Sequence, residues 1–259
     1  MIEVKHLSKS FDGQTVLDDV SCRFLPGRNN IIIGQSGSGK TVLLKCLIGL
    51  HVPDAGEILF DGRDIVTMAP KEMKQLRKEI GVLFQGSALF DSMTVAENVA
   101  FPLQMFSQMT ADERDERVRF CLDRVDLKPG TLRRYPSELS GGMQKRVAIA
   151  RAIALNPRYL FCDEPNSGLD PQTSIRIDQL LDDITKEYGI TTIINTHDMN
   201  SVLGIGDTIT YLDQSRVEWT GTKDEIMSTT NAALSSFIFA SPVMQRARQA
   251  AAHPSVQSR

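Results

Sequence analysis

The chain has 259 residues, of which 41% are hydrophobic, and this length allows one compact unit with a sizeable buried core. Its formal net charge of −3 argues against a nucleic-acid binder that uses an extended basic face, but leaves a local basic patch open. The four cysteines form no Cys-x-x-Cys pair, so we expect reduced thiols in a cytoplasmic protein. No apolar run reaches the roughly 18 residues of a membrane span, so we expect that only a partner would anchor the protein to a membrane.

Short runs of strand-forming sequence, separated by turn signals, occupy the N-terminal part of the chain. The runs span residues 2–7, 16–24, 30–33 and 57–60. Turn signals such as Asp12-Gly13 and Pro26-Gly27 separate them. The pattern predicts an N-terminal sheet, and Asp61-Gly62 predicts one more hairpin.

A glycine-rich loop follows the run at residues 30–33. Its members are Gly34, Gln35, Ser36, Gly37, Ser38, Gly39, Lys40 and Thr41. Helix-like sequence comes next, and the order strand, glycine-rich loop, Lys-Thr and helix is typical of a phosphate-binding loop. We expect Lys40 to reach the β- and γ-phosphates and Thr41 to ligate Mg²⁺. Val42 stands where many such loops carry a second hydroxyl, but its backbone N–H still serves the α-phosphate.

Helix-forming sequence dominates between residues 85 and 156. A strand is predicted at 80–84, and the capping box of Thr110 and Glu113 begins a helix. A second helix is expected from residue 141 to 155. Because strand-forming sequence flanks this stretch on both sides, it predicts a helical lobe inserted into an α/β core.

The sequence Leu139-Ser140-Gly141-Gly142-Met143 opens the second of these helices. A Ser-Gly-Gly turn at a helix N-terminus offers N–H groups to an anion, yet no acidic residue or lysine stands beside it. We therefore interpret it as half of an ATP site that receives phosphate oxygens delivered by another subunit. Dimerisation would then be part of the mechanism.

Two short apolar runs, at residues 158–162 and 190–195, predict buried parallel strands. The first ends at Asp163 and Glu164, and the second leads to His197. Since open α/β sheets place ligand chemistry at the carboxyl ends of strands, we expect these side chains at one sheet edge. Asp163 is a candidate for holding Mg²⁺ through water, Glu164 for acting as a base on the attacking water, and His197 for sensing the γ-phosphate.

Gln85 also stands at the end of a predicted strand. Its amide is expected to complete the shell of the magnesium ion or of the water, and to relay motion to the helical lobe. An ordinary polar turn is the competing interpretation.

The segment between the two buried runs predicts a helix. Asp170 is its cap, Pro171 occupies its first position, and it ends near Gly189. A strand, helix and strand in this order imply a right-handed parallel crossover. Residues 208–212 and 216–219 predict a closing hairpin, and residues 250–259 a frayed end.

Six motifs resemble, in order, those of ATP-binding cassette (ABC) ATPases. They are Gly34 to Thr41, Gln85, Leu139 to Met143, Tyr159 to Pro165, Ser167 to Asp170, and His197. The resemblance covers roughly residues 1–225 and implies an α/β fold of the P-loop, RecA-like type. In that fold, residues 1–85 and 156–225 would form the nucleotide-binding core with an N-terminal antiparallel β subdomain. Residues 86–155 would form the inserted α-helical subdomain, and residues 226–259 a C-terminal extension with a flexible end.

The resemblance also implies an enzyme that hydrolyses ATP with Mg²⁺ and works as a head-to-tail dimer. Each ATP would be held by the phosphate loop of one copy and by Ser140, Gly141 and Gly142 of the other. Asp170 would lie at the dimer seam. Phe11 matches the aromatic residue that stacks on adenine, although a core phenylalanine is an equally open interpretation.

Met143, together with residues 83–103, resembles the ATPases of MCE-type phospholipid transport systems in Gram-negative bacteria and their plastid and mycobacterial relatives. The implied partners are a membrane permease, an MCE lipid-binding protein and a small regulatory subunit. The implied location is the cytoplasmic face of the inner membrane, reached through the permease. Phe90 and Met93 are expected to contact that permease, with packing inside the helical lobe as the alternative.

Other functions remain open at this point. A cassette that drives a membrane partner without transport, as in cell division, would carry the same motifs, and so would a transporter of another substrate. The apolar residues 237–239 in the tail predict packing on the chain's own core or contact with a neighbouring ATPase or regulator. A regulatory GTPase is disfavoured because the Asn-Lys-x-Asp base-reading motif is absent.

Overall fold

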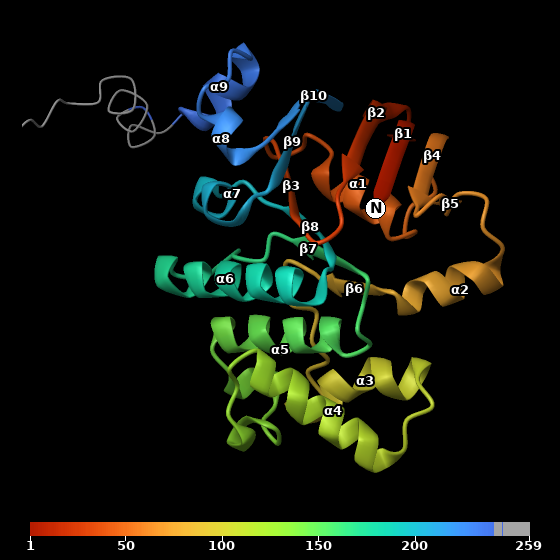
Figure 1. Cartoon of the computed structure of the whole chain (residues 1–259), viewed down its shortest axis with the longest axis vertical. Coiled ribbons are helices and arrows are strands. Elements are labelled where there is room, and N and C mark those ends of the chain that lie inside the picture. Colours follow the sequence, from red (N-terminus) through yellow and green to blue (C-terminus); the bar gives the residue numbers. More distant parts are fainter. Residues whose placement is uncertain (241–244, 246–259) are drawn as a thin grey trace, which may run out of the picture.

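The computed structural model describes residues 1–240 and residue 245, and it contains two β-sheets (Figure 1). The smaller sheet is antiparallel, with the strand order β2-β1-β4-β5. The larger sheet has six strands in the order β10-β9-β3-β8-β7-β6, and only the β9–β10 pair is antiparallel. The strands are β1 (Ile2–Phe11), β2 (Gln14–Phe24), β3 (Asn29–Ile33), β4 (Ala55–Phe60), β5 (Arg63–Asp64), β6 (Ile80–Leu83), β7 (Tyr159–Asp163), β8 (Thr191–Asn195), β9 (Thr208–Asp213) and β10 (Arg216–Gly221).

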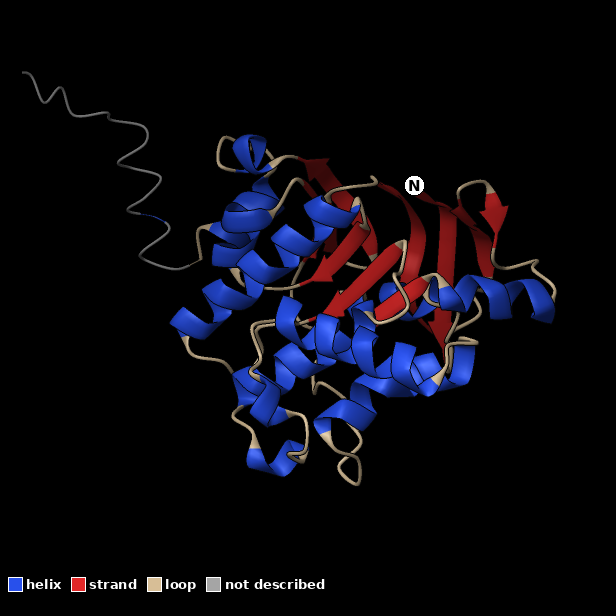
Figure 2. Ribbon diagram, turned by 60° about the horizontal axis from the view of Figure 1, so that its bottom comes forward, coloured by secondary structure: helices blue, strands red, loops and turns tan. Residues whose placement is uncertain are grey.

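Helices cover the larger sheet, and three of them are stacked beyond α6 at the lower end of the view in Figure 1. Figure 2 shows helices gathered below the strands, which are red. These three are α3, α4 and α5, so the helical lobe lies on the far side of α6 from the antiparallel sheet. The helices are α1 (Lys40–Leu47), α2 (Pro70–Lys78), α3 (Val95–Phe106), α4 (Ala111–Arg124), α5 (Gly141–Ile153), α6 (Pro171–Tyr188), α7 (Met199–Ile205), α8 (Lys223–Ile226) and α9 (Ala232–Ile238).

The core divides into two clusters because side chains alternate between the two faces of the larger sheet. Ile31 and Ile33 of β3 belong to the cluster that contains α5 and α6, whereas Ile32 joins the cluster that contains α1 and the antiparallel sheet. Strand β7 alternates in the same way, with Leu160 in the first cluster and Phe161 in the second. Every residue of β3, β7 and β8 is buried, because both faces of these strands are covered.

Helix ends predicted from local sequence are confirmed. The Thr110 hydroxyl accepts a hydrogen bond from the Glu113 N–H, while the Glu113 carboxylate accepts one from the Thr110 N–H. Asp170 caps α6, and Gly189 ends it in the left-handed conformation at φ 62°. The predicted hairpins at Asp61-Gly62 and between β9 and β10 are present as well.

Four helices were absent from the sequence prediction, namely α2, α7, α8 and α9. Their apolar signal is weak: α2 buries only Leu76, and α9 buries Leu234 and Ile238. The tail residues 237–239 pack on the chain's own core, since Ile238 and Phe239 are buried and the Phe237 ring lies 5.4 Å from the Tyr211 ring. The expected frayed end at residues 250–259 lies outside the described part of the chain. The division at residues 85, 155 and 225 stays a prediction.

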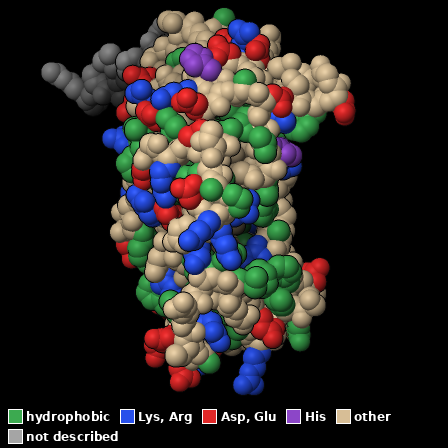
Figure 3. Space-filling view, turned by 90° about the vertical axis from the view of Figure 1, so that its right-hand side faces the viewer, with side chains coloured by type: hydrophobic (Ala, Val, Ile, Leu, Met, Phe, Trp, Pro, Cys, Tyr) green, Lys and Arg blue, Asp and Glu red, His purple; other side chains and the backbone are tan. Residues whose placement is uncertain are grey.

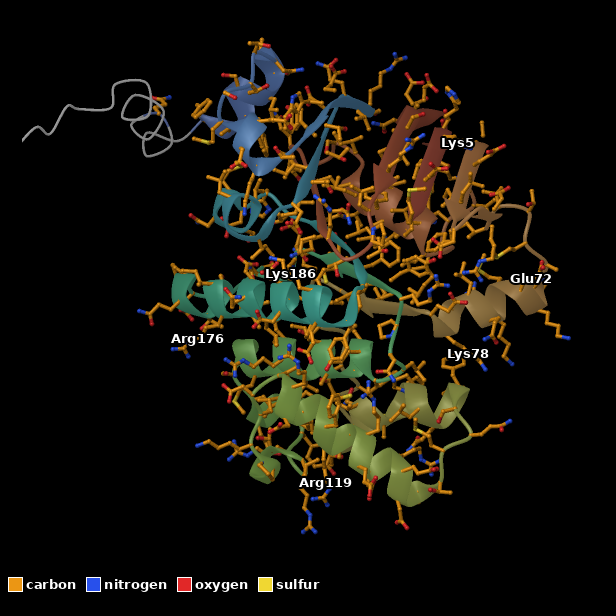
Figure 4. All side chains as sticks on the ribbon, in the orientation of Figure 1. Lys5, Glu72, Lys78, Arg119, Arg176 and Lys186 are labelled. Atoms are coloured by element: carbon orange, nitrogen blue, oxygen red, sulfur yellow. The ribbon has the colours of Figure 1, made fainter. Side chains whose placement is uncertain are left out.

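The surface carries charges of both signs. On the face drawn in Figure 3, Lys and Arg side chains alternate with Asp and Glu. Figure 4 shows Arg119 and Arg176 projecting away from α4 and α6. Across residues 1–240 and 245, no helix combines the length and apolar character that crossing a bilayer requires.

Candidate active site

The phosphate loop, which connects β3 to α1, borders a cavity of about 590 Å³. Residues from four other segments reach the same cavity: Gln85 after β6, Glu164 after β7, His197 after β8, and Phe237 from α9. Strands β3, β8, β7 and β6 are parallel neighbours, so their carboxyl ends meet at one edge of the sheet. The sheet therefore gathers the predicted residues that the sequence separates by more than a hundred positions.

Close backbone packing explains two of the loop glycines. A Cβ atom on Gly34 would lie 2.2 Å from the Leu212 carbonyl oxygen, and one on Gly39 would lie 2.7 Å from the Val16 carbonyl oxygen. Gly39 also has φ +104°, which L side chains rarely adopt. A side chain at either position would force the loop away from the strands that support it.

Lys40 is held over its own loop. Its Nζ donates to the carbonyl oxygens of Gly34 at 2.8 Å and Gln35 at 2.9 Å. Burial lowers the pKa of this ammonium, while the carboxylates of Glu164 and Asp163 oppose that shift. A phosphate group would supply the negative charge that this partly desolvated ammonium lacks.

The Ser38 hydroxyl also fits an anion at this loop. Its Oγ is buried and, within the described residues, has no hydrogen-bond partner. Buried hydroxyl groups are nearly always paired, so an unpaired one in a phosphate loop fits an oxygen of a bound nucleotide. The loop therefore has the chemistry of a triphosphate site.

Thr41 and Asp163 provide the oxygen atoms that a magnesium ion prefers. The Thr41 Oγ1 donates to Asp163 Oδ1 at 3.4 Å. Asn195 fixes this carboxylate, because its Nδ2 donates to Asp163 Oδ1 at 3.1 Å and to the Lys40 carbonyl oxygen at 3.0 Å. Asn195 was not predicted from the sequence, although a polar residue ending a buried strand beside Asp163 is a detectable signal.

Glu164 and His197, predicted to act together, are in direct contact. His197 Nδ1 lies 3.0 Å from Glu164 Oε1, and the imidazole is largely exposed while the carboxylate is only 16% exposed. Glu164 has φ 47°, a left-handed conformation that is unfavourable for a residue with a side chain. Such strain is typical of functional sites, and here it aims the carboxylate into the phosphate cavity.

Gln85 lines the cavity, but its amide is engaged elsewhere. The Nε2 donates to the Ser167 hydroxyl at 3.3 Å. The structure therefore brings Gln85 to the correct sheet edge without placing its amide on Thr41 or Asp163. A role in the magnesium shell stays a prediction and requires the contact with Ser167 to break.

The Ser-Gly-Gly turn lies apart from this cavity within one chain. Ser140 caps α5 by accepting a hydrogen bond from the Met143 N–H at 3.4 Å. A Cβ atom on Gly142 would lie 2.6 Å from Thr173 Cγ2, so the turn packs against the start of α6. Among the described residues that line the phosphate cavity, none comes from positions 139–143.

Asp170 is the cap of α6 and lies next to that turn. Its carboxylate accepts hydrogen bonds from the N–H groups of Gln172 and Thr173, each at 3.0 Å, and from the Thr173 hydroxyl at 2.6 Å. The bonds from Thr173 lower the pKa of this carboxyl. Asp170 and Gly142 thus share Thr173 as a neighbour, which places both on the same surface.

The sequence profile of the ABC transporter family matches residues 17–167. The chain belongs to this family. A probable ribonucleotide transport ATP-binding protein, mkl of Mycobacterium leprae, is 38% identical over 92% of this chain and 68% of its own. The methionine import ATP-binding protein MetN of Clostridium acetobutylicum is also 38% identical, over 92% of this chain and 74% of its own. Among solved structures, the fold resembles the ATP-binding cassette MJ0796, a dimer in a post-hydrolysis state with ADP and Pi. The two structures superpose with a TM-score of 0.79 and 34% sequence identity, over 86% of this chain and 99% of MJ0796.

These similarities confirm the predicted ABC cassette fold and show that the chain is an ABC-type ATPase of a transporter. Membership of the same family supports the expectation that the bound nucleotide is ATP. What the relatives transport differs between them, so their names do not assign a cargo to this ABC ATPase.

Two aromatic residues of the ABC ATPase differ from expectation. Phe11 is 37% exposed, with its ring 5.2 Å from His51 and the Lys9 ammonium 5.2 Å from its centre, so the interpretation as a core residue is wrong. Its role in stacking on adenine stays a prediction. Phe237 lines the phosphate cavity from α9 and was missed, because no local motif marks an aromatic residue so far along the chain.

Proposed function

We propose that two copies of this ATPase close head to tail around two ATP molecules and drive a lipid transporter of the membrane. One observation carries the dimeric part of the proposal: a single chain gathers the phosphate loop, Glu164 and His197 around one cavity, with Asp163 bonded to Thr41 of the loop, whereas its Ser140-Gly142 turn lies elsewhere. A second copy is the simplest source of the missing turn. The dimeric relative with ADP and Pi supports this arrangement.

Each residue would then have a distinct task. Lys40 and Ser38 would bind phosphate oxygens, and the positive end of α5 of the second copy would face the γ-phosphate through Ser140, Gly141 and Gly142. Glu164 would orient the attacking water and accept its proton, with His197 holding that carboxylate in place. Asp170 would lie at the seam between the copies.

Thr41 and Asp163 would hold Mg²⁺, with Gln85 as the further expected ligand. The bound ion would neutralise charge on the phosphates. The 3.4 Å approach of the Thr41 hydroxyl to Asp163 supports this assignment, because both oxygens already face one another at the loop.

A groove of about 510 Å³ on the helical lobe supports docking of a permease. Phe90, which is 41% exposed, packs its ring 4.8 Å from Phe101 at this groove, and Arg151 lines it as well. An apolar groove with one guanidinium suits an amphipathic cytoplasmic helix that carries an acidic residue. We infer that Phe90 and the partly buried Met93 contact such a helix and that the permease holds the ATPase at the cytoplasmic face of the inner membrane.

The cargo proposal depends on a narrower feature. Met143 and residues 83–103 resemble MCE-type phospholipid systems, which adds an MCE lipid-binding protein and a regulatory subunit as partners. Met143 lies on the first turn of α5 and packs against the core. It therefore indicates the subfamily and has no proposed role in hydrolysis. Methionine import is a second candidate, favoured by the 38% identity to MetN.

Purification of the tagged ATPase from detergent-solubilised membranes tests both candidates. We expect a permease together with an MCE protein, and we expect the reconstituted complex to move fluorescent phospholipid between vesicles only when ATP is hydrolysed. The Glu164→Gln variant is the matched control. Stimulation of the ATPase by methionine with a substrate-binding protein, and no lipid movement, would favour the importer; a complex that moves neither would point to a mechanical role as in cell division.

A further inference from the structure

Two cationic side chains of helix α5 hydrogen-bond to the backbone of the segment that begins at Gln85. The ammonium of Lys145 donates to the carbonyl oxygen of Gln85. Six residues further along the helix, the Arg151 guanidinium donates to the carbonyl oxygens of Ser87 at 2.8 Å and Ala88 at 2.7 Å. Helix α5 therefore holds residues 85–88 through three of their four carbonyl groups. We call these four residues the gripped segment.

The gripped segment needs such support because its backbone is strained. Ser87 has φ 62° and Ala88 has φ 46°. Two consecutive residues with side chains in the left-handed region are unfavourable and persist only when the surroundings enforce them. Hydrogen bonds from Arg151 to both carbonyl groups supply that enforcement.

Lys145 is an unusual choice for this position. Its side chain is nearly fully buried, at 4% exposure for the residue, and burial lowers its pKa. Asp163 and Glu164 favour its charged form from a distance, although Lys145 makes its hydrogen bond to a backbone carbonyl and not to a carboxylate.

The two cations also connect three functional parts of the chain. Helix α5 begins at the Ser140 turn, Lys145 contacts the backbone of Gln85, and Arg151 lines the groove beside Phe90, with its guanidinium 6.0 Å from the ring centre. A helix of 13 residues moves as a rigid body on this scale. Displacement of its first turn therefore displaces the gripped segment and the groove together.

We propose that Lys145 and Arg151 are positioning residues that couple the Ser140 turn to Gln85 and to the permease groove. Through them, engagement of the turn with the nucleotide of a second copy sets the position of Gln85 at the phosphate cavity. The inference rests on the proposed role of Gln85 in hydrolysis. Neither cation is among the residues that line the phosphate cavity.

Five variants of the full chain test the coupling. In Lys145→Met and Arg151→Met the grip is removed while most of the side-chain volume is kept, and Lys145→Arg restores a charged donor. Arg117→Met is the matched control, because the Arg117 guanidinium donates to the carbonyl oxygens of Ile153 and Ala154 at the C-terminal end of α5, close to Arg151, and, within the described part of the chain, makes no hydrogen bond to residues 85–88. Gln85→Ala serves as the reference for loss of the proposed ligand.

We expect Lys145→Met and Arg151→Met to bind a fluorescent ATP analogue within about twofold of the wild type, because the phosphate loop is untouched. Their kcat should fall about tenfold, which is the effect of losing a hydrogen bond to a charged group. Lys145→Arg should recover most of that loss. Amide hydrogen exchange at residues 86–90 should become faster in both methionine variants and stay unchanged in Arg117→Met.

Two results would overturn the inference, and they can be told apart. If Gln85→Ala hydrolyses ATP normally, the role of Gln85 is wrong and the coupling has no target. If Gln85→Ala is impaired but the methionine variants match Arg117→Met in kcat and in exchange at residues 86–90, Lys145 and Arg151 do not position the segment. The melting temperature and the exchange of the remaining amides are measured alongside, and faster exchange supports the inference only where it is confined to residues 86–90.

Discussion

Replacing Glu164 by glutamine is the sharpest test of the catalytic arrangement. The carboxylate lies 3.0 Å from His197 Nδ1 and faces the phosphate cavity from a strained backbone at φ 47°. Glutamine has the same shape and keeps an oxygen for the His197 contact, so the fold and the nucleotide site should persist. Only the ability to accept a proton from water is lost.

The expected magnitude follows from that single loss. General bases contribute about 10²- to 10⁴-fold to a rate, or about 3 to 5 kcal/mol of activation free energy. In Glu164→Gln, phosphate release at saturating ATP should fall by this factor while the affinity for ATP stays within a few-fold. Because hydrolysis no longer separates the copies, gel filtration with ATP should show a dimer that is absent without nucleotide.

A matched control separates the role of the residue from a general effect of charge. Glu57 lies on β4 at the surface, 3.9 Å from Lys5, and Glu57→Gln should leave turnover unchanged. If Glu164→Gln retains a turnover within about threefold of the wild type, another group accepts the proton and the assignment is refuted. Failure to form an ATP-dependent dimer would instead contradict the head-to-tail arrangement.

Three further predictions follow from individual contacts. Lys40→Ala should weaken ATP binding about 100-fold in a fluorescence titration, because two charge-assisted phosphate contacts are lost; an unchanged Kd would refute the role of the loop. In urea titrations, Gly81→Ala should lower the free energy of unfolding by about 2 kcal/mol or more, since its Cβ would lie 2.4 Å from the Ala152 carbonyl oxygen. Gly204→Ala, which has open space in α7, should raise the free energy of unfolding by about 0.5 to 1 kcal/mol. Burial raises the folded-state pKa of Asp178 above its ordinary value of 3.8, so stability falls as the pH rises through 3.8 and the loss is complete once the pH exceeds the raised pKa. Asp178→Asn should therefore melt at a higher temperature than the wild type at neutral pH, and the difference should vanish as the pH falls towards 3.8; a constant difference would contradict the burial effect.

The residues that meet at the phosphate loop and the sheet edge were predictable because each belongs to a local pattern. The glycine-rich loop, the Asp163-Glu164 pair and His197 each follow a short apolar run, and such runs predict buried strands whose ends meet. Helix caps such as Thr110 and Asp170 were predictable for the same reason, since a cap bonds to residues two or three positions away. Short helices such as α2 and α9 escaped prediction because each buries only one or two residues.

The chain by itself thus determined the reaction class, the order of strands and helices around the phosphate loop, and the residues at the sheet edge. Only the tertiary structure decided where Gln85 directs its amide, that Phe11 is exposed, that Phe237 reaches the cavity, and that Lys145 holds a backbone group 60 positions away. These features depend on how elements distant in the sequence pack together, such as α5 against β6 and α9 beside β9. Docking is set by the summed burial of many side chains, and no short stretch of sequence records it.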